Sequence, residues 1–401
     1  MVKKPVRSIV AAIAAAARRW TDPAFAPRRR ARDAVGERTG YSLPSVDFAF
    51  DALFDALRHD AIEAVIADEL GELDVLDRWT RRGNGASRRA LPLGRICIVS
   101  SRTTIGVAIV PAIFALCAKC NILVKDRDDH LVAAFFATLR EELPELSEAA
   151  HAQTWGGTRE MRALSGFDGV VAFGNDATLK EIAGSLPFET RFIPYGTRAT
   201  AGYVIREALQ SEPEARAIAR DAARALVLYE SEGCLSLHAL FVERGGAIST
   251  ARFAELFADA VRAAALEFPP GGPDAAAAMR RAAARDLATF RGAGALYSDS
   301  TATCLTILDP PCEAPPLFLP LAIGVHSIER PHQAAAYLER HGIAIEALGV
   351  ARSRPDLLEL AAAIGAARVV PFDALQMPPL AALHGGRPRI AEFVRWVVEE
   401  T

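Results

Sequence analysis

The sequence predicts a mixed α/β protein whose strands run parallel in sheets that helices cover. Short apolar segments of strand length alternate with longer segments of helical length over most of the chain. The short segments are apolar at consecutive positions, which is typical of strands buried on both faces. A length of 401 residues leaves room for two or three domains. Because such sheets bind ligands at the carboxyl ends of their strands, those ends hold the first candidate site residues.

The N-terminal part predicts helices. Residues 8–20 are rich in Ala and Ile and predict a first helix, and the periodicity of 46–57 and 61–70 predicts two more. Residues 81–89 contain two glycines and a serine and predict a linker. Arginines and lysines dominate residues 3–38. We interpret this excess as a solvated face or a loose arm rather than as a surface for an acidic partner.

The next part predicts a first parallel sheet, and the residues that follow its strands are candidates for ligand contacts. No G-x-G-x-x-G motif follows any of these strands, so the usual dinucleotide turn is not signalled. Lys125 at one strand end could contact ribose hydroxyls or a phosphate, or could simply be solvated. We expect strands at 95–100, 121–125, 168–173 and 191–194, helices at 107–119, 130–143 and 180–186, and candidate contacts at Ser100, Lys125, Gly174, Asn175 and Gly196.

The alternation of strands and helices continues to the end of the chain. Residues 389–400 predict a closing helix or a mixed segment. We expect helices at 213–226, 252–266, 275–290, 333–341 and 356–364, and strands at 237–242, 302–308, 322–327, 343–348 and 367–371.

Composition excludes several classes of protein. A net charge of −3 argues against a general nucleic-acid-binding protein. Six cysteines in 401 residues make no disulfide framework, and no spacing matches a zinc site. The longest apolar run, residues 105–118, contains Pro111 and is shorter than the ~20 residues of a membrane span. With no secretory signal recognised, we expect a cytoplasmic protein with neither a metal nor a membrane span.

Cys234 is the strongest candidate for a catalytic residue. It lies in the segment E-G-C-L-S, residues 232–236, between a helical pattern and an apolar strand. Gly233 has no side chain to block the approach of a substrate to the sulfur. Because reactive cysteines have lowered pKa values, we expect the pKa of Cys234 to be lowered if it is the nucleophile. The simpler interpretation is a small buried residue, because free cysteine is among the most buried types. His238 would be well separated from Cys234 on a strand, so a Cys-His hydrolase dyad is disfavoured.

Four stretches together resemble the LuxC-like acyl-CoA reductases, a branch of the aldehyde dehydrogenase superfamily, and the resemblance runs from about Tyr41 to the C-terminus. Their common order and spacing carry the resemblance. The stretches are 94–125, with its L-V-K strand; 167–176 with 192–198, which contain A-F-G-N-D and Y-G-T-R; 233–243, with G-C-L-S and V-E; and H-G-G-R-P at 384–388, followed by Trp396.

The resemblance implies an aldehyde dehydrogenase-like fold and a reduction in two steps. N-terminal helices and a Rossmann-like cofactor domain would cover 1–196, an α/β catalytic domain 197–375, and residues 376–401 would return to the cofactor cleft or a dimer interface. Cys234 would attack an acyl thioester and release the carrier thiol. NADPH, or else NADH, would then deliver hydride to the acyl-cysteine, and an aldehyde would leave.

The same resemblance implies the partners of the reaction. The donor would be a long-chain acyl group on CoA, on a carrier or on another protein, and an acyl-transfer or synthetase protein could supply it. The chain would form a homo-oligomer. Ser100, Lys125, Gly174, Asn175 and Gly196 would lie at the cofactor.

The chain departs from the family pattern in the turn S-S-R-T-T-I-G, residues 100–106. Thr103 stands where the family has an Asn whose side chain helps to bind the oxyanion, so Thr103 would be a second donor with a shorter reach. Losing one such donor costs roughly 10² to 10³ in kcat. Leu237 replaces a common Pro. Tyr195 stands where oxidising relatives carry a water-activating Glu, and with an unperturbed pKa of about 10 it is a poor base. The alternative is that Tyr195 only packs and that another carboxylate, Glu230 or Glu232, activates the water. An oxidative aldehyde dehydrogenase and a catalytically weak acyl-binding subunit of a biosynthetic complex stay open as alternatives.

Overall fold

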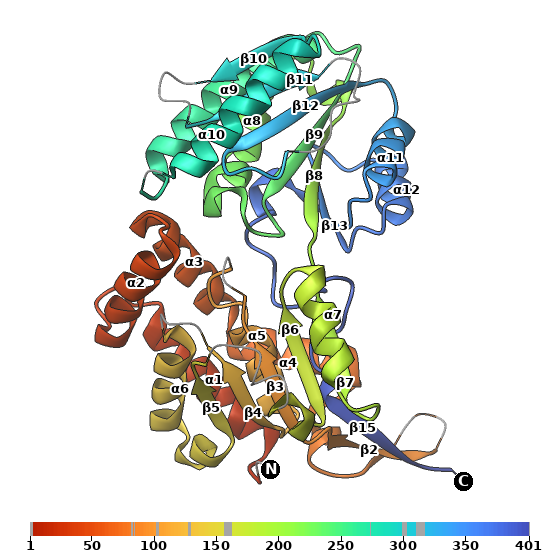
Figure 1. Ribbon diagram of the computed structural model, residues 1–401. Coiled ribbons are helices and arrows are strands. Elements are labelled where there is room, and N and C mark those ends of the chain that lie inside the picture. The colour runs from red at the N-terminus through yellow and green to blue at the C-terminus, as the bar shows by residue number, and fades with distance from the viewer. Residues whose placement is uncertain are drawn as a thin grey trace.

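The computed structural model describes residues 3–81, 83, 85–101, 104–126, 130–155, 163–272, 274–298, 303–309 and 317–400. Within them, the chain forms two α/β parts stacked on one another, with both chain ends at the far edge of the lower part (Figure 1). The lower part holds a five-stranded sheet and the N-terminal helices, and the upper part holds a seven-stranded sheet. The predicted class, largely parallel sheets covered by helices, is confirmed.

Four helices open the chain and share an aromatic core. Trp20 is fully buried among the rings of Phe50, Phe54 and Phe135. Its Nε1 donates a hydrogen bond of 3.0 Å to Oγ1 of Thr138, so the polar edge of the buried ring is also satisfied. The helices are α1 (Val6–Trp20), α2 (Ala26–Thr39), α3 (Leu43–Ala56) and α4 (His59–Leu70).

The arginine-rich stretch forms helix α2, so the expectation of a solvated face or loose arm was wrong for its key residues. Arg28 is 2% exposed, donates to the carbonyl of Trp20 at 2.7 Å and pairs with Asp51 at 2.7 Å. Arg32 donates two hydrogen bonds, of 2.7 and 2.8 Å, to the carboxylate of Asp47. Such bidentate pairs fix orientation as well as adding energy. These arginines therefore attach α2 to α3.

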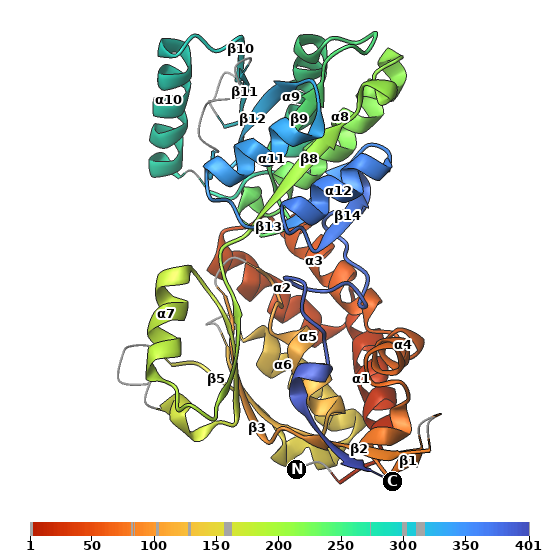
Figure 2. The ribbon, with the colours of Figure 1, turned by 90° about the vertical axis from the view of Figure 1, so that its right-hand side faces the viewer.

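The lower sheet has the strand order β5-β4-β3-β6-β7, and every neighbouring pair is parallel. Helix α7 lies on one face, and α5 and α6 lie with the N-terminal helices on the other (Figure 2). The elements are β3 (Arg95–Val99), α5 (Ile109–Cys117), β4 (Asn121–Lys125), α6 (Leu131–Glu142), β5 (Ala150–Gln153), β6 (Gly169–Phe173), α7 (Asp176–Ser185) and β7 (Arg191–Tyr195).

The upper sheet has the strand order β10-β11-β12-β9-β8-β13-β14, and only the pair β10–β11 is antiparallel. Helices α8 and α9 pack on one face, and α11 and α12 pack on the other (Figure 1). The elements are β8 (Ala199–Val204), α8 (Glu212–Val227), β9 (Leu237–Glu243), α9 (Thr250–Glu267), α10 (Ala275–Phe290), β10 (Ala295–Ser298), β11 (Leu305–Asp309), β12 (Ala322–Ile328), α11 (Pro331–Arg340), β13 (Ile345–Val350), α12 (Pro355–Ala363) and β14 (Arg368–Pro371).

A third, small sheet joins two segments that are far apart in the sequence. Strand β15 (Val394–Glu399) pairs antiparallel with β2 (Ser87–Pro92), which also pairs with β1 (Thr80–Arg81). The expected linker at 81–89 therefore overlaps a strand from Ser87 on, and residues 389–400 form a mixed segment, a 3-10 turn at Ala391–Phe393 followed by β15, and not a helix. The Val and Trp side chains of β15 favour a strand, but a local sequence pattern does not show which distant strand it pairs with.

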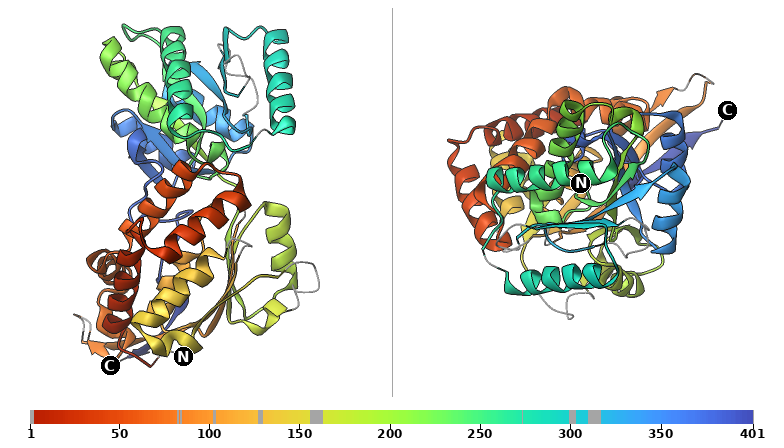
Figure 3. Two further views of the ribbon diagram at one scale, coloured as in Figure 1. Left: turned by 90° about the vertical axis from the view of Figure 1, so that its left-hand side faces the viewer. Right: turned by 90° about the horizontal axis from the view of Figure 1, so that it is seen from above.

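Helix α3 connects the lower part to the upper part. Figure 3 shows the red segment at the start of the chain reaching the upper part. The ring of Phe48 on α3 packs edge-on against Phe268 at 5.9 Å. Just before α3, the hydroxyl of Tyr41 donates to Glu232 at 3.2 Å. An N-terminal helix thus lies against the segment that contains Cys234.

Candidate active site

Cys234 comes just after a turn with unusual backbone geometry. Tyr229, Glu230 and Ser231 have φ angles of 57°, 51° and 63°. For a residue with a Cβ atom, this left-handed region costs about 1–2 kcal/mol. Such strain tends to occur at functional sites, where the surrounding structure holds it in place.

Side-chain hydrogen bonds hold this turn. The hydroxyl of Ser231 donates to the carbonyl of Leu226 at 2.9 Å and accepts from the backbone N–H of Leu321 at 3.2 Å. The carboxylate of Glu230 accepts from the backbone N–H of Gly271 at 2.7 Å. These contacts come from three separate segments, so the turn presents Cys234 in one fixed position.

Thr200 on the neighbouring strand β8 holds the backbone of Cys234. Thr200 is fully buried, and its Oγ1 donates a hydrogen bond of 2.8 Å to the carbonyl of Cys234. This bond links the nucleophile candidate directly to the centre of the upper sheet.

Thr200→Val keeps the shape of the side chain but removes this donor. We expect the free energy of unfolding to fall by about 1–3 kcal/mol, because a buried carbonyl loses its partner. Chemical denaturation of the wild type, Thr200→Val and Thr200→Ser measures the effect, with the serine variant as the control that keeps the hydroxyl. Equal stability of the valine and serine variants would show that the bond contributes nothing.

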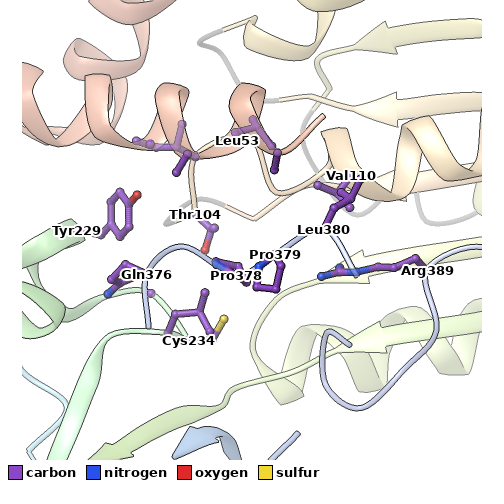
Figure 4. Close-up of a pocket in the computed structure, with 16 residues that line it drawn as sticks. Leu53, Thr104, Val110, Tyr229, Cys234, Gln376, Pro378, Pro379, Leu380 and Arg389 are labelled. Atoms are coloured by element: carbon purple, nitrogen blue, oxygen red, sulfur yellow. The ribbon is translucent and has the colours of Figure 1, made fainter. Parts of the chain in front are cut away.

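Cys234 lines two cavities of different character. A cleft of about 600 Å³ lies between the two parts and is lined by residues at the carboxyl ends of β3, β4, β6 and β7. Cys234 also lines a smaller apolar cavity of about 160 Å³ (Figure 4). The cleft brings together Cys234 and all five residues expected at the cofactor, namely Ser100, Lys125, Gly174, Asn175 and Gly196.

The residues at the strand ends shape the floor of the cleft. Asn175 caps helix α7, and its Oδ1 accepts from the backbone N–H of Thr178 at 2.9 Å. A Cβ atom at Gly196 would lie 2.6 Å from Oδ1 of Asp176, so only glycine fits there without displacing that side chain. The ammonium group of Lys125 lies 5.7 Å from the ring centre of Trp155, within range of a cation–π contact.

An aromatic stack forms one wall of the cleft. The rings of Phe173 and Tyr195 stack at 4.8 Å, and His384 stacks on Tyr195 at 4.4 Å. Burial raises the pKa of Tyr195 above its ordinary value and lowers the pKa of His384 to about 3. Tyr195 is therefore a packed, protonated phenol at neutral pH and not a base for water.

The surroundings of Cys234 raise its pKa, so the expected lowering was wrong. Burial of the thiol raises the pKa of Cys234 to about 12, and the negative charge of Glu346 adds to the effect. The backbone N–H of Cys234 and the charges of Arg198 and Arg368 act in the opposite direction. These three groups are the ones that would stabilise negative charge at the sulfur.

The two other candidate residues are Thr103 and His238. Thr103 lies outside the described residues, whereas its neighbour Thr104 lines both cavities. The ring of His238 faces away from the cavities that Cys234 lines: its Nε2 lies 3.0 Å from the carbonyl of Ser231, and burial lowers its pKa to about 4. Cys234 and His238 therefore do not form a catalytic pair.

Three contributions to the site escaped the sequence analysis. They are the wall of the apolar cavity formed by α3, the buried carboxylate of Glu346 on β13, and Arg389, which lines the apolar cavity. Of the three, only Glu346 could have been noticed from the local sequence, because it is a charged residue in an otherwise apolar strand. Residues of α3 and Arg389 line one cavity with Cys234 although they are far from it in the sequence, and a local pattern does not reveal such proximity.

Neither a metal site nor a membrane span is found in the part of the chain that the structure describes. There, no group of three His, Cys, Asp or Glu side chains could hold a metal ion, and no helix is both long and apolar enough to cross a membrane. The five described cysteines are all free.

A family model described as "Acyl-CoA reductase (LuxC)" matches residues 1–396. Solved structures with the same fold include aldehyde dehydrogenase 21 from Physcomitrella patens, with a TM-score of 0.74, 11% identity and coverage of 98% of this chain and 85% of that one. A benzaldehyde dehydrogenase from Corynebacterium glutamicum gives a TM-score of 0.75, 13% identity and coverage of 100% and 87%. No curated protein matches the chain significantly.

Proposed function

The chain belongs to the LuxC family of acyl-CoA reductases, and from that premise we propose that it reduces an acyl thioester to an aldehyde through an acyl-cysteine on Cys234. The observation that carries the proposal is the position of Cys234 between two cavities. One is largely apolar and suits an acyl group, and the other is a wider and more polar cleft at strand ends, where parallel sheets bind nucleotides.

The first half of the reaction forms a bond between the sulfur of Cys234 and the acyl carbon and breaks the bond to the carrier sulfur. The carrier thiolate takes up the proton that Cys234 gives up. Arg198 and Arg368 favour the thiolate that attacks. The backbone N–H of Cys234 would donate to the oxyanion, and we propose Thr103 as the second donor.

The second half returns Cys234 to a free thiolate as the aldehyde leaves. NADPH, or alternatively NADH, supplies the hydride when it is bound in the cleft. The cleft fits such a cofactor, because a cation, Lys125, lies at one strand end and Gly196 leaves room at another. The proposed contacts are Ser100, Lys125, Gly174, Asn175 and Gly196. Tyr195 is protonated and stacked, which disfavours hydrolysis of the acyl-cysteine by water.

The proposed donor is acyl-CoA or an acyl group on a carrier or protein, which a synthetase or acyl-transfer protein could deliver. A homo-oligomer is supported by the ribbon of β2 and β15, which leaves Trp396, Val397 and Val398 between 39% and 45% exposed. Apolar residues gathered on one edge are typical of a surface that another chain covers.

Product analysis tests the proposed function. The purified chain is incubated with acyl-CoA and either NADPH or NADH, and the products are identified by mass spectrometry. We expect an aldehyde and free CoA. Oxidation of an aldehyde to an acid without CoA would favour an oxidative aldehyde dehydrogenase. Cofactor binding without turnover of any thioester would favour an acyl-binding subunit.

Lys125→Met is expected to raise the KM for the cofactor by about tenfold or more, because a charge-assisted contact to ribose or phosphate is lost. The KM for the acyl donor should change far less. If Lys125 reaches a 2′-phosphate, the variant should also lose preference for NADPH over NADH. Lys180→Met, at an exposed position on α7 that does not line the cleft, is the matched control. Equal changes in the KM values for the cofactor and for the acyl donor would show that Lys125 does not contact the cofactor.

A further inference from the structure

The apolar cavity beside Cys234 is small. Its volume is about 160 Å³, and its walls come from α3 and from the segment 376–380 (Figure 4). An apolar cavity of about 150 Å³ in another protein holds one benzene molecule, which has six carbon atoms. The space beside Cys234 therefore suits an acyl group of about that size. Small side chains on α3, Ala49, Ala52 and Ala56, contribute to the wall that faces the site.

One cation, Arg389, lies among these apolar walls. Figure 4 shows its side chain extending toward Pro379, with its nitrogen atoms at the end nearer Cys234. No described residue forms a hydrogen bond or an ion pair with its guanidinium group, and its Nε is buried without a partner. A buried polar group that lacks a partner costs free energy, and an unpaired charge costs more.

The neighbouring carboxylates do not compensate Arg389 fully. The carboxylate of Glu69 accepts hydrogen bonds from the backbone N–H groups of residues 389, 390 and 391, at 2.5 to 3.0 Å. Glu346 accepts from the backbone N–H of Gly385 and lies 3.7 Å from the guanidinium of Arg198. The charge of Glu346 also acts on Arg368. Three guanidinium groups thus share two carboxylates, and both carboxylates also accept hydrogen bonds from backbone N–H groups.

We propose that the acyl group reduced here is short, about four to six carbon atoms, and carries a carboxylate at its far end. The donor would then be the half-thioester of a short dicarboxylic acid. This rests on the proposed function, since it names the acyl group that the same site accepts. The thioester carbon would lie at Cys234, the methylene groups against the α3 wall, and the terminal carboxylate at Arg389.

The chemistry of Arg389 favours this class over a plain fatty acyl chain. A guanidinium group and a carboxylate form charge-assisted, often bidentate hydrogen bonds, which satisfy both groups when they leave water. A fatty chain in the same place would put methylene groups against an unpaired cation. It would also exceed the volume of about 160 Å³ and extend out of the cavity.

Kinetics with three CoA thioesters tests the proposal. The values of kcat/KM are compared for glutaryl-CoA, hexanoyl-CoA and tetradecanoyl-CoA. We expect glutaryl-CoA to be preferred over hexanoyl-CoA by about 10- to 100-fold, as for hydrogen bonds to a charged group. Tetradecanoyl-CoA should be the poorest. In Arg389→Met, the ratio of glutaryl-CoA to hexanoyl-CoA should fall at least tenfold.

Arg387→Met is the matched control, because Arg387 lies in the same segment but pairs with Glu392 and lines neither cavity. It should leave the ratio unchanged. The proposal is overturned if hexanoyl-CoA or tetradecanoyl-CoA equals or exceeds glutaryl-CoA, or if Arg389→Met lowers kcat/KM for all donors by the same factor.

A binding measurement separates this proposal from the proposed function. Free glutarate should slow the alkylation of Cys234 more than hexanoate does, and Arg389→Met should abolish the difference. If no thioester is reduced, the proposed function fails. The protection of Cys234 from alkylation by glutarate or hexanoate still shows which acyl group the cavity accepts. Equal protection by the two acids, or none, would overturn the proposal.

Discussion

Cys234→Ala is expected to abolish the reduction of acyl-CoA while leaving binding of the cofactor intact. Removing a catalytic nucleophile costs roughly 10⁴ to 10⁶ in kcat, because no other group forms the covalent intermediate. Aldehyde formation measures the loss, and cofactor fluorescence on titration measures the binding. An unchanged cofactor Kd is expected because the contacts proposed for the cofactor come mostly from the lower part.

Cys304→Ala serves as the control for cysteine removal. Cys304 is buried in the core of the upper part and lines neither cavity that contains Cys234. Its variant should keep activity within a few-fold. If the Cys234→Ala variant turns over at more than a hundredth of the wild-type rate, another residue must be the nucleophile.

The thiol of Cys234 should react slowly when the site is empty. With a pKa of about 12, about one molecule in 10⁴ carries the thiolate at pH 8, whereas a free cysteine of pKa about 8.5 is roughly one-quarter ionised. Alkylation should therefore be about 10³-fold slower than for a free thiol. Because the pKa is raised, the rate should increase about tenfold for each pH unit until the pH approaches that value.

Peptide mass spectrometry after timed exposure to iodoacetamide gives this rate for Cys234 separately from the buried Cys97, Cys117 and Cys120. Glu346→Gln should speed the reaction, because the carboxylate opposes the negative charge of the thiolate. A rate at pH 8 equal to that of a free thiol would show that the ligand-free site does not suppress ionisation.

Local sequence patterns were sufficient to predict most of the buried helices and strands. Strand β4 and helix α10 have the expected bounds, because apolar runs and Ala-rich periodicity each signal one structure. The residues expected at the cofactor line one cleft with Cys234, since the ends of parallel strands lie along one edge. Their roles as cofactor contacts stay a prediction.

Contacts between distant segments could not be predicted in this way. Strand β8 was not expected, because Ala and Gly weaken its pattern. Yet a Cβ atom at Gly202 would lie 2.8 Å from Leu240 and Phe372, so the packing of the sheet requires glycine there. Helix α2 was missed because its arginines look solvated until their partners Asp47 and Asp51 on α3 are known. The pairing of β15 with β2 depends on partners about 300 residues apart.

The central claim is that an acyl group is transferred to Cys234 before reduction, and intact-mass measurement tests it most directly. The chain is incubated with acyl-CoA in the absence of cofactor, and its mass is recorded before and after NADPH is added. We predict a mass increase equal to one acyl group, located on Cys234 by peptide mapping and lost as aldehyde when NADPH arrives. An unchanged mass under conditions in which the complete mixture produces aldehyde would contradict the account, because reduction would then proceed without an acyl-cysteine.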